Sequence, residues 1–114
     1  AMPAYQDYAI RAKRADAKSA ILTVQLAEEK WRANNSSYTD LMTNLGYPGD
    51  SAQDSEDGNY KISVTGSSAT AYVITAVPQG TQATNDTECA NFITNQNNTQ
   101  TISGSGSATN CWGR

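Results

Sequence analysis

Residues 3–34 read PAYQDYAIRAKRADAKSAILTVQLAEEKWRAN, and this stretch predicts one long α-helix. No Gly or Pro occurs between Ala4 and Ala33, and most of the residues there are good helix formers such as Ala, Leu, Glu, Lys and Arg. Pro3 suits the first turn of a helix. The polar run at 34–37 favours caps and turns, so we expect the helix to end there.

The predicted helix carries two apolar stripes on roughly opposite sides. One stripe is enough to dock a helix on its own domain, so a second stripe needs another partner. We expect the first to pack on the sheet and the second to contact other subunits; the alternative is a helix buried on all sides. The packing stripe contains Ala17, Ala20, Ile21, Val24, Ala27 and Trp31, and the assembly stripe contains Tyr8, Ala12, Ala15, Leu22 and Leu26.

The rest of the chain predicts a small antiparallel sheet. Residues 60–65 alternate apolar with polar side chains, and a more buried strand at 70–77 completes a hairpin. Two weaker strands are expected at 89–94 and 99–103. The fold class is therefore α+β, with the long helix packed on a three- or four-stranded antiparallel sheet. We expect a single domain over 1–114, made of a helix (1–34), a connecting loop (35–59), the sheet (60–103) and a C-terminal region (89–111).

Composition argues against catalysis. The chain has no His, which excludes a Ser-His-Asp triad and His-ligated zinc. The acidic segment 50–58 lacks the spacing and closing Glu of an EF-hand loop. We therefore expect no enzymatic activity, no cofactor and no metal.

The charge balance disfavours generic binding of nucleic acid. The net charge is −3, and acidic chains bind phosphate backbones poorly. No nucleic-acid partner is expected. The charge is nevertheless uneven, because Arg11, Lys13, Arg14 and Lys18 all lie in the first part of the helix.

Two cysteines, Cys89 and Cys111, lie in the last quarter of the chain. A minimal even count in a polar chain of low charge favours one disulfide formed in an oxidising compartment; the alternative is two free thiols in the cytosol.

Several segments, in order along the chain, resemble a type IV pilin of the PilE class of minor pilins. They are PAYQDY at 3–8, AEEKWRANNSSY at 27–38, DGNYKISV at 57–64, AVPQGTQ at 76–82, DTEC at 86–89 and CW at 111–112. The resemblance implies the pilin fold and a disulfide loop bounded by Cys89 and Cys111. It also implies a further apolar N-terminal segment, which would anchor the subunit in the inner membrane and then pack in the filament.

The resemblance implies a structural subunit of a Gram-negative pilus filament, found in the inner membrane and periplasm before assembly. We expect a minor pilin that primes pilus assembly and serves twitching motility and adhesion. Its expected partners are other minor pilins, the major pilin and a tip adhesin. The alternatives are a DNA-receptor pilin for competence, which a basic surface patch would favour, and a pseudopilin of type II secretion.

Overall fold

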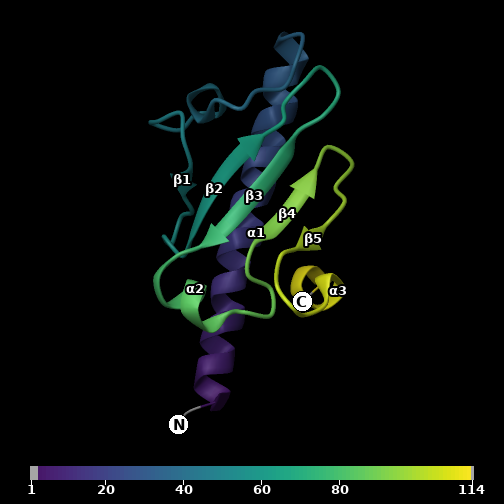
Figure 1. Cartoon of the computed structure of the whole chain (residues 1–114). Coiled ribbons are helices and arrows are strands. Elements are labelled where there is room, and N and C mark those ends of the chain that lie inside the picture. The colour runs from purple at the N-terminus through teal and green to yellow at the C-terminus, as the bar shows by residue number, and fades with distance from the viewer. Residues whose placement is uncertain (1–2, 114) are drawn as a thin grey trace.

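A computed structural model describes residues 3–113 and begins with one long helix, α1 (Pro3–Asn34), as the sequence predicts. The first two residues of the predicted helix lie outside the described residues. The molecule measures 52 × 27 × 17 Å, and α1 runs along its length (Figure 1). At the end of α1, the Asn35 side-chain amide donates to the Trp31 carbonyl at 2.8 Å, which satisfies an otherwise unpaired helix-end acceptor. Among the described helices, none is long and apolar enough to cross a membrane.

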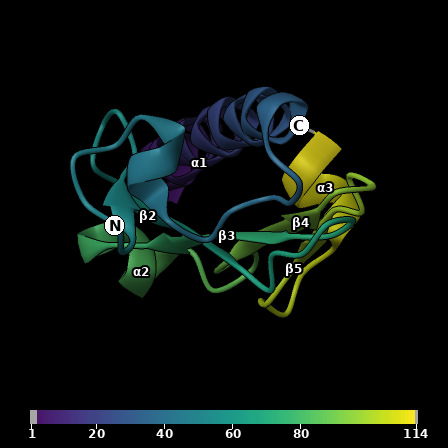
Figure 2. The ribbon, with the colours of Figure 1, turned by 90° about the horizontal axis from the view of Figure 1, so that it is seen from above.

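The sheet is an antiparallel meander of five strands in the order β1-β2-β3-β4-β5. The strands are β1 (Gln53–Asp54), β2 (Tyr60–Thr65), β3 (Val73–Pro78), β4 (Phe92–Asn95) and β5 (Thr101–Ile102). In the central pair, Ile62 lies opposite Ala76, and alternate residues of both strands are buried. Seen from above, α1 covers one face of this sheet (Figure 2). The predicted α+β class, a long helix with an antiparallel sheet, is thus confirmed.

The core lies between α1 and the covered face of the sheet. From the packing stripe, Ala17, Ile21 and Val24 are almost completely buried, and Trp31 is half-buried against the same cluster. The sheet and loops supply the other large buried side chains, namely Met42, Tyr60, Ile62, Ile74 and Phe92. Removing this apolar surface from water is the main force that holds the helix to the sheet.

The strand count and the loop content differ from the prediction. The sheet has five strands rather than three or four, because residues 35–59 contain β1 and a short 3-10 helix, η1 (Met42–Leu45). Two further short helices, α2 (Gly80–Asn85) and α3 (Ala108–Gly113), were not expected. The predicted strands at 89–94 and 99–103 are shorter than expected, at Phe92–Asn95 and Thr101–Ile102. Each of these short elements depends on tertiary pairing, which a local pattern does not reveal.

The C-terminal region is closed by the predicted disulfide between Cys89 and Cys111, whose Cα atoms lie 5.9 Å apart. Inside this loop, residues 103–106 run beside residues 87–91. The Gly104 amide donates to the Cys89 carbonyl at 3.0 Å, and the Gly106 amide donates to the Glu88 carbonyl at 2.8 Å. Trp112 packs edge-on against Phe92, with ring centroids 5.2 Å apart. The loop is therefore an ordered part of the body despite its polar composition.

Candidate functional site

The basic residues at the start of α1 all have partners in the structure. Arg11 pairs with Asp7 at 3.0 Å, Lys13 donates to the Thr81 hydroxyl at 2.9 Å, and Lys18 donates to the Cys111 carbonyl at 3.2 Å. Lys13 and Lys18 thereby tie α1 to α2 and α3. These side chains hold elements together rather than forming an open basic patch.

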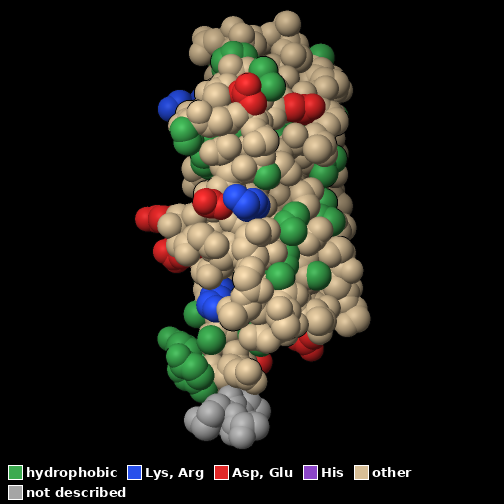
Figure 3. Space-filling model, turned by 60° about the vertical axis from the view of Figure 1, so that its left-hand side comes forward, with side chains coloured by type: hydrophobic (Ala, Val, Ile, Leu, Met, Phe, Trp, Pro, Cys, Tyr) green, Lys and Arg blue, Asp and Glu red, His purple; other side chains and the backbone are tan. Residues whose placement is uncertain are grey.

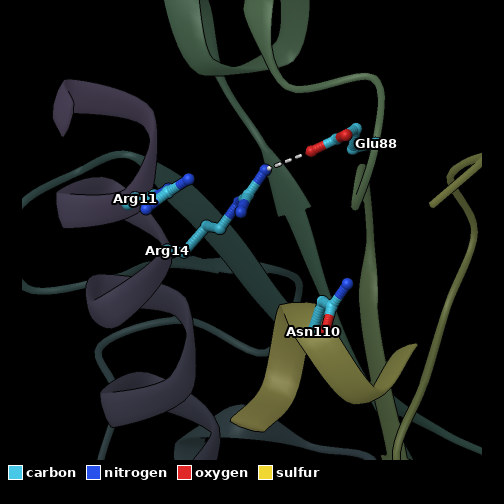
Figure 4. Close-up of a pocket in the computed structure, with 4 residues that line it drawn as sticks. All are labelled: Arg11, Arg14, Glu88 and Asn110. Atoms are coloured by element: carbon cyan, nitrogen blue, oxygen red, sulfur yellow. Dashed lines mark hydrogen bonds and ion pairs between the residues drawn. The ribbon is translucent and has the colours of Figure 1, made fainter. Parts of the chain in front are cut away.

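Arg14 is largely buried, with a side chain only 13% exposed. It donates two hydrogen bonds to Asp86, at 2.8 and 2.7 Å, and a weaker one to Glu88 at 3.5 Å. The hydrogen bonds to Asp86 are the main reason that the pKa of Arg14 is raised. A hollow of ≈ 370 Å³ lies beside it, lined by Arg11, Arg14, Glu88 and Asn110 (Figure 4). Because acidic groups already compensate both arginines, this hollow is poorly suited to a phosphate.

A second hollow, which we call the α1-end hollow, lies where the long helix finishes. Its volume is ≈ 390 Å³, and it offers an ammonium group, amide side chains and an indole. Lys30 is exposed and forms no ion pair within the part of the chain that the structure describes. The lining residues are Ala27, Lys30, Trp31, Asn34, Asn35, Asn44 and Leu45.

The α1-end hollow is built from two segments. Four residues of α1 and the adjoining Asn35 form one wall, and Asn44 and Leu45 of η1 form the other. Asn44 is held in place by Thr39, whose hydroxyl oxygen accepts a hydrogen bond from the Asn44 side-chain amide at 2.9 Å. The same oxygen accepts from the Leu41 backbone amide at 3.0 Å. The position of Asn44 therefore depends on the position of Thr39.

Thr39 is in turn fixed by a buried acid, Glu28, on α1. The Glu28 side chain is inaccessible to solvent, and its Oε1 accepts a hydrogen bond from the Thr39 amide at 3.1 Å. Its Oε2 is buried and has no hydrogen-bond partner. Burial is the main cause that raises the pKa of Glu28 to about 7, with smaller contributions from Asp40 and Glu29. A buried carboxylate without a balancing cation is expensive, which favours the neutral acid.

The assembly stripe of α1 faces away from the core. Tyr8, Leu22 and Leu26 are 71%, 55% and 59% exposed, and Ala12 and Ala15 are also exposed. Within residues 3–113, these five side chains therefore remain exposed rather than joining the core. Figure 3 shows a different side of the molecule, where hydrophobic side chains gather at the N-terminal end and separate positive and negative charges are scattered above them.

The α1-end hollow was not identified from the sequence. Its α1 wall has a local signal, since Lys30 and Asn34 are four residues apart and so lie on the same side of a helix. Asn44 carried no such signal, because only the folded loop brings it to the end of α1. In the structure, the candidate binding site is therefore the far end of α1 rather than its basic start.

Comparison with known protein families finds a match over residues 3–93, to the family described as type IV minor pilin ComP, DNA uptake sequence receptor. A search of curated proteins finds no match. The family match supports a minor pilin in general and does not show the PilE class. It also conflicts with the expectation that no nucleic acid binds. Since the match covers most of the chain, this chain belongs to the type IV minor pilin family described as ComP, DNA uptake sequence receptor.

Proposed function

We propose that this minor pilin is a DNA receptor of a type IV pilus and that DNA contacts the α1-end hollow. The observation that carries the DNA role is the family match over residues 3–93, whose description names a DNA uptake sequence receptor. Membership of the type IV minor pilins also implies a pilus-associated location and other pilins as partners. The proposal replaces the expectation of a subunit without a nucleic-acid partner.

The chemistry of the α1-end hollow supports this choice of contact site. The Lys30 ammonium suits a phosphate. Asn34, Asn35 and Asn44 carry amides of the kind that pair with the edge of adenine. Trp31 contributes an aromatic surface to the same hollow. The hollow is lined by residues at the C-terminal end of α1. This end lies far from the start of the helix (Figure 1), and the pilin resemblance leaves it clear of the filament centre.

The net charge of −3 shapes the kind of binding we expect. Non-specific affinity for DNA comes mostly from neutralised phosphates, and this chain offers few unpaired cations for that purpose. Recognition should therefore depend on contacts with bases more than on the general field of the protein. A binding sequence is best found by selecting bound duplexes from a random library with the wild-type protein.

The test compares Lys30→Ala and Asn34→Ala with Lys13→Ala, which removes the same charge from the other end of α1. Affinity for the selected duplex, followed by fluorescence anisotropy over a range of salt, should fall several-fold for both variants at the hollow. Lys30→Ala should also reduce the salt slope by about 1. Lys13→Ala should stay close to wild type. No DNA binding by the wild type would refute the receptor role, and equal losses in Lys13→Ala and Lys30→Ala would refute the site.

We also propose that the assembly stripe is the surface through which the subunit joins the filament. This second role, which includes the expected priming of assembly, is favoured by the exposure of Tyr8, Leu22 and Leu26 on a helix whose other side packs against the core. Leu22→Asp and Leu26→Asp should leave the monomer folded, because exposed substitutions usually change stability by less than about 0.5 kcal/mol. Both should block incorporation into pili. Gln100→Asp, which adds the same charge on an exposed turn, is the matched control. Normal incorporation of both leucine variants would exclude this face.

A further inference from the structure

Glu28 occupies an unusual position, because a side chain that normally carries charge is sealed inside the domain. It is inaccessible to solvent on α1, one oxygen accepts from the Thr39 amide at 3.1 Å, and the other oxygen has no partner. Oε2 has no protein partner in either protonation state. Burying an unpartnered neutral acid nevertheless costs much less free energy than burying a carboxylate.

Among the described groups around Glu28, the Thr39 amide favours a negative charge, because its hydrogen bond lowers the pKa of the acid, but burial acts in the opposite direction and has the larger effect. On α1, Glu29 repels it, and Arg32 donates instead to the carbonyls of Ala69 and Asn35. From the loop after α1, Asp40 also repels it, and Tyr38 donates its hydroxyl hydrogen to Glu29. From the segment before β3, the buried Tyr72 contributes a phenol whose own pKa is raised to about 12, mainly by burial. The surroundings of the carboxyl are thus acidic or neutral.

A short chain of hydrogen bonds joins Glu28 to the α1-end hollow. Glu28 holds the Thr39 amide, and the Thr39 hydroxyl oxygen accepts from the side-chain amide of Asn44 at 2.9 Å. Asn44 lines the hollow. A displacement of Thr39 would therefore move a polar side chain that lines the hollow, although Glu28 itself is not one of the lining residues.

We propose that Glu28 is a positioning residue for the α1-end hollow: its protonated side chain holds Asn44 in place through Thr39, and its ionisation releases the segment 39–45. Ionisation strengthens the single hydrogen bond from the Thr39 amide, but a carboxylate that is buried and unpartnered at Oε2 gains more from hydration, so the loop moves away from α1 to admit water. The inference deepens the proposed function and rests on it for the effect on DNA. The hydrogen-bond chain itself is independent of any ligand.

The first test follows backbone and side-chain amides by NMR between about pH 5 and about pH 9, a range that brackets the pKa of about 7 given for Glu28. The amides of Thr39 and Leu41 and the side-chain amide of Asn44 should shift together with a midpoint near that value. Glu28→Gln, which keeps the acceptor oxygen for Thr39, should abolish this transition. Glu56→Gln, which neutralises an exposed acid, should leave it unchanged.

The NMR chemical shift of the Glu28 carboxyl carbon in the wild-type protein gives the midpoint of its ionisation directly, so this part of the test does not depend on the folding of a variant. A carboxyl that does not titrate in this pH range, as the ordinary value of 4.5 would require, would overturn the inference, and so would a transition that survives in Glu28→Gln. A carboxyl that titrates while Thr39 and Asn44 remain unchanged would overturn it as well, because the acid would then be buried without positioning the hollow.

The second test measures affinity for the selected duplex over the same pH range. Wild-type affinity should fall by about 5-fold or more as Glu28 ionises. Glu28→Gln lacks the ionisable group, and Thr39→Val lacks the link to Asn44. The affinity of Glu28→Gln should therefore depend on pH no more strongly than the affinity of Thr39→Val. A parallel fall in all three proteins would overturn the coupling. If DNA does not bind at all, the proposed receptor function fails while the amide transition still stands, so the two failures are distinguishable.

Discussion

Buried carboxylates tie α1 to the segments that surround it. Asp16 accepts hydrogen bonds from the Ser55 hydroxyl and from the amides of Asp57 and Asn59, so it fixes the turn between β1 and β2. Asp86 accepts from Arg14 of α1 and from the amide of Cys89. In each case an ionisable side chain organises a loop, because several donors converge on one acceptor group.

The Arg14–Asp86 pair should contribute strongly to stability. Asp86 is 1% exposed, and Arg14 is 13% exposed. Asp86→Ala leaves the guanidinium largely buried without its main partner, so we expect a loss of about 3 kcal/mol in the free energy of unfolding. Urea denaturation measures it. Glu88→Ala removes an acid that is 75% exposed and 3.5 Å from Arg14, and it should cost less than about 1 kcal/mol. Equal losses of stability in Asp86→Ala and Glu88→Ala would show that the buried pair contributes no more than the exposed one.

At the scale of elements, the turn at Gly104 closes the disulfide loop by contact between two backbone segments. A Cβ at this position would lie 2.2 Å from the Glu88 carbonyl oxygen and 2.6 Å from that of Thr87. The absence of a side chain is therefore a requirement of the close approach.

Gly104→Ala should destabilise the C-terminal region by more than about 2 kcal/mol, because backbone on both sides must shift to relieve the clash. Thermal unfolding followed by circular dichroism provides the measurement. Gly113→Ala is the control, since a Cβ there meets nothing within 4 Å. An unchanged melting temperature in Gly104→Ala would mean that the two segments separate in solution.

The elements with a repeated local pattern are the ones the sequence could predict. The 3.6-residue spacing of α1, the alternation in β2 and the apolar run that contains most of β3 are properties of single segments, and each pattern predicted the right kind of element. The two-residue strand β1 exists because it pairs with β2, and α2 is held in part by the Gln82 amide, which donates to the Tyr60 hydroxyl at 2.9 Å. The α1-end hollow has the same dependence, since Asn44 reaches it only through Thr39 and Glu28.

The whole molecule is long and thin, so its core is small and a covalent link matters. The disulfide joins residues 22 apart in sequence and connects the segment before β4 to α3. Reduction, or Cys89→Ser with Cys111→Ser, should lower stability by about 3 kcal/mol, because the unfolded chain regains loop entropy. A melting temperature lowered by reductant and unchanged by a chelator is the expected result. Insensitivity to reductant would contradict it.

Alkaline pH should unfold the domain through its central tyrosine. Burial raises the pKa of Tyr60 from 10.0 to about 12, an effect opposed by the hydrogen bond from Gln82. Because the folded pKa is the higher one, the stabilising contribution is complete below pH 10 and disappears as pH approaches 12. Tyrosinate absorbance and circular dichroism should show a late ionisation step that coincides with unfolding. Complete ionisation of all tyrosines in a folded protein would contradict the expectation.

The length of α1 gives the subunit a mechanical direction. The helix runs along the 52 Å axis, with the α1-end hollow at one end and the N-terminus at the other (Figure 1). A pull applied between these two ends acts along a continuous ladder of helix hydrogen bonds. The strands and the C-terminal loop lie beside this line rather than in series with it. Tension would therefore load the helix first, and the sheet could keep its shape while the subunit is drawn by either end.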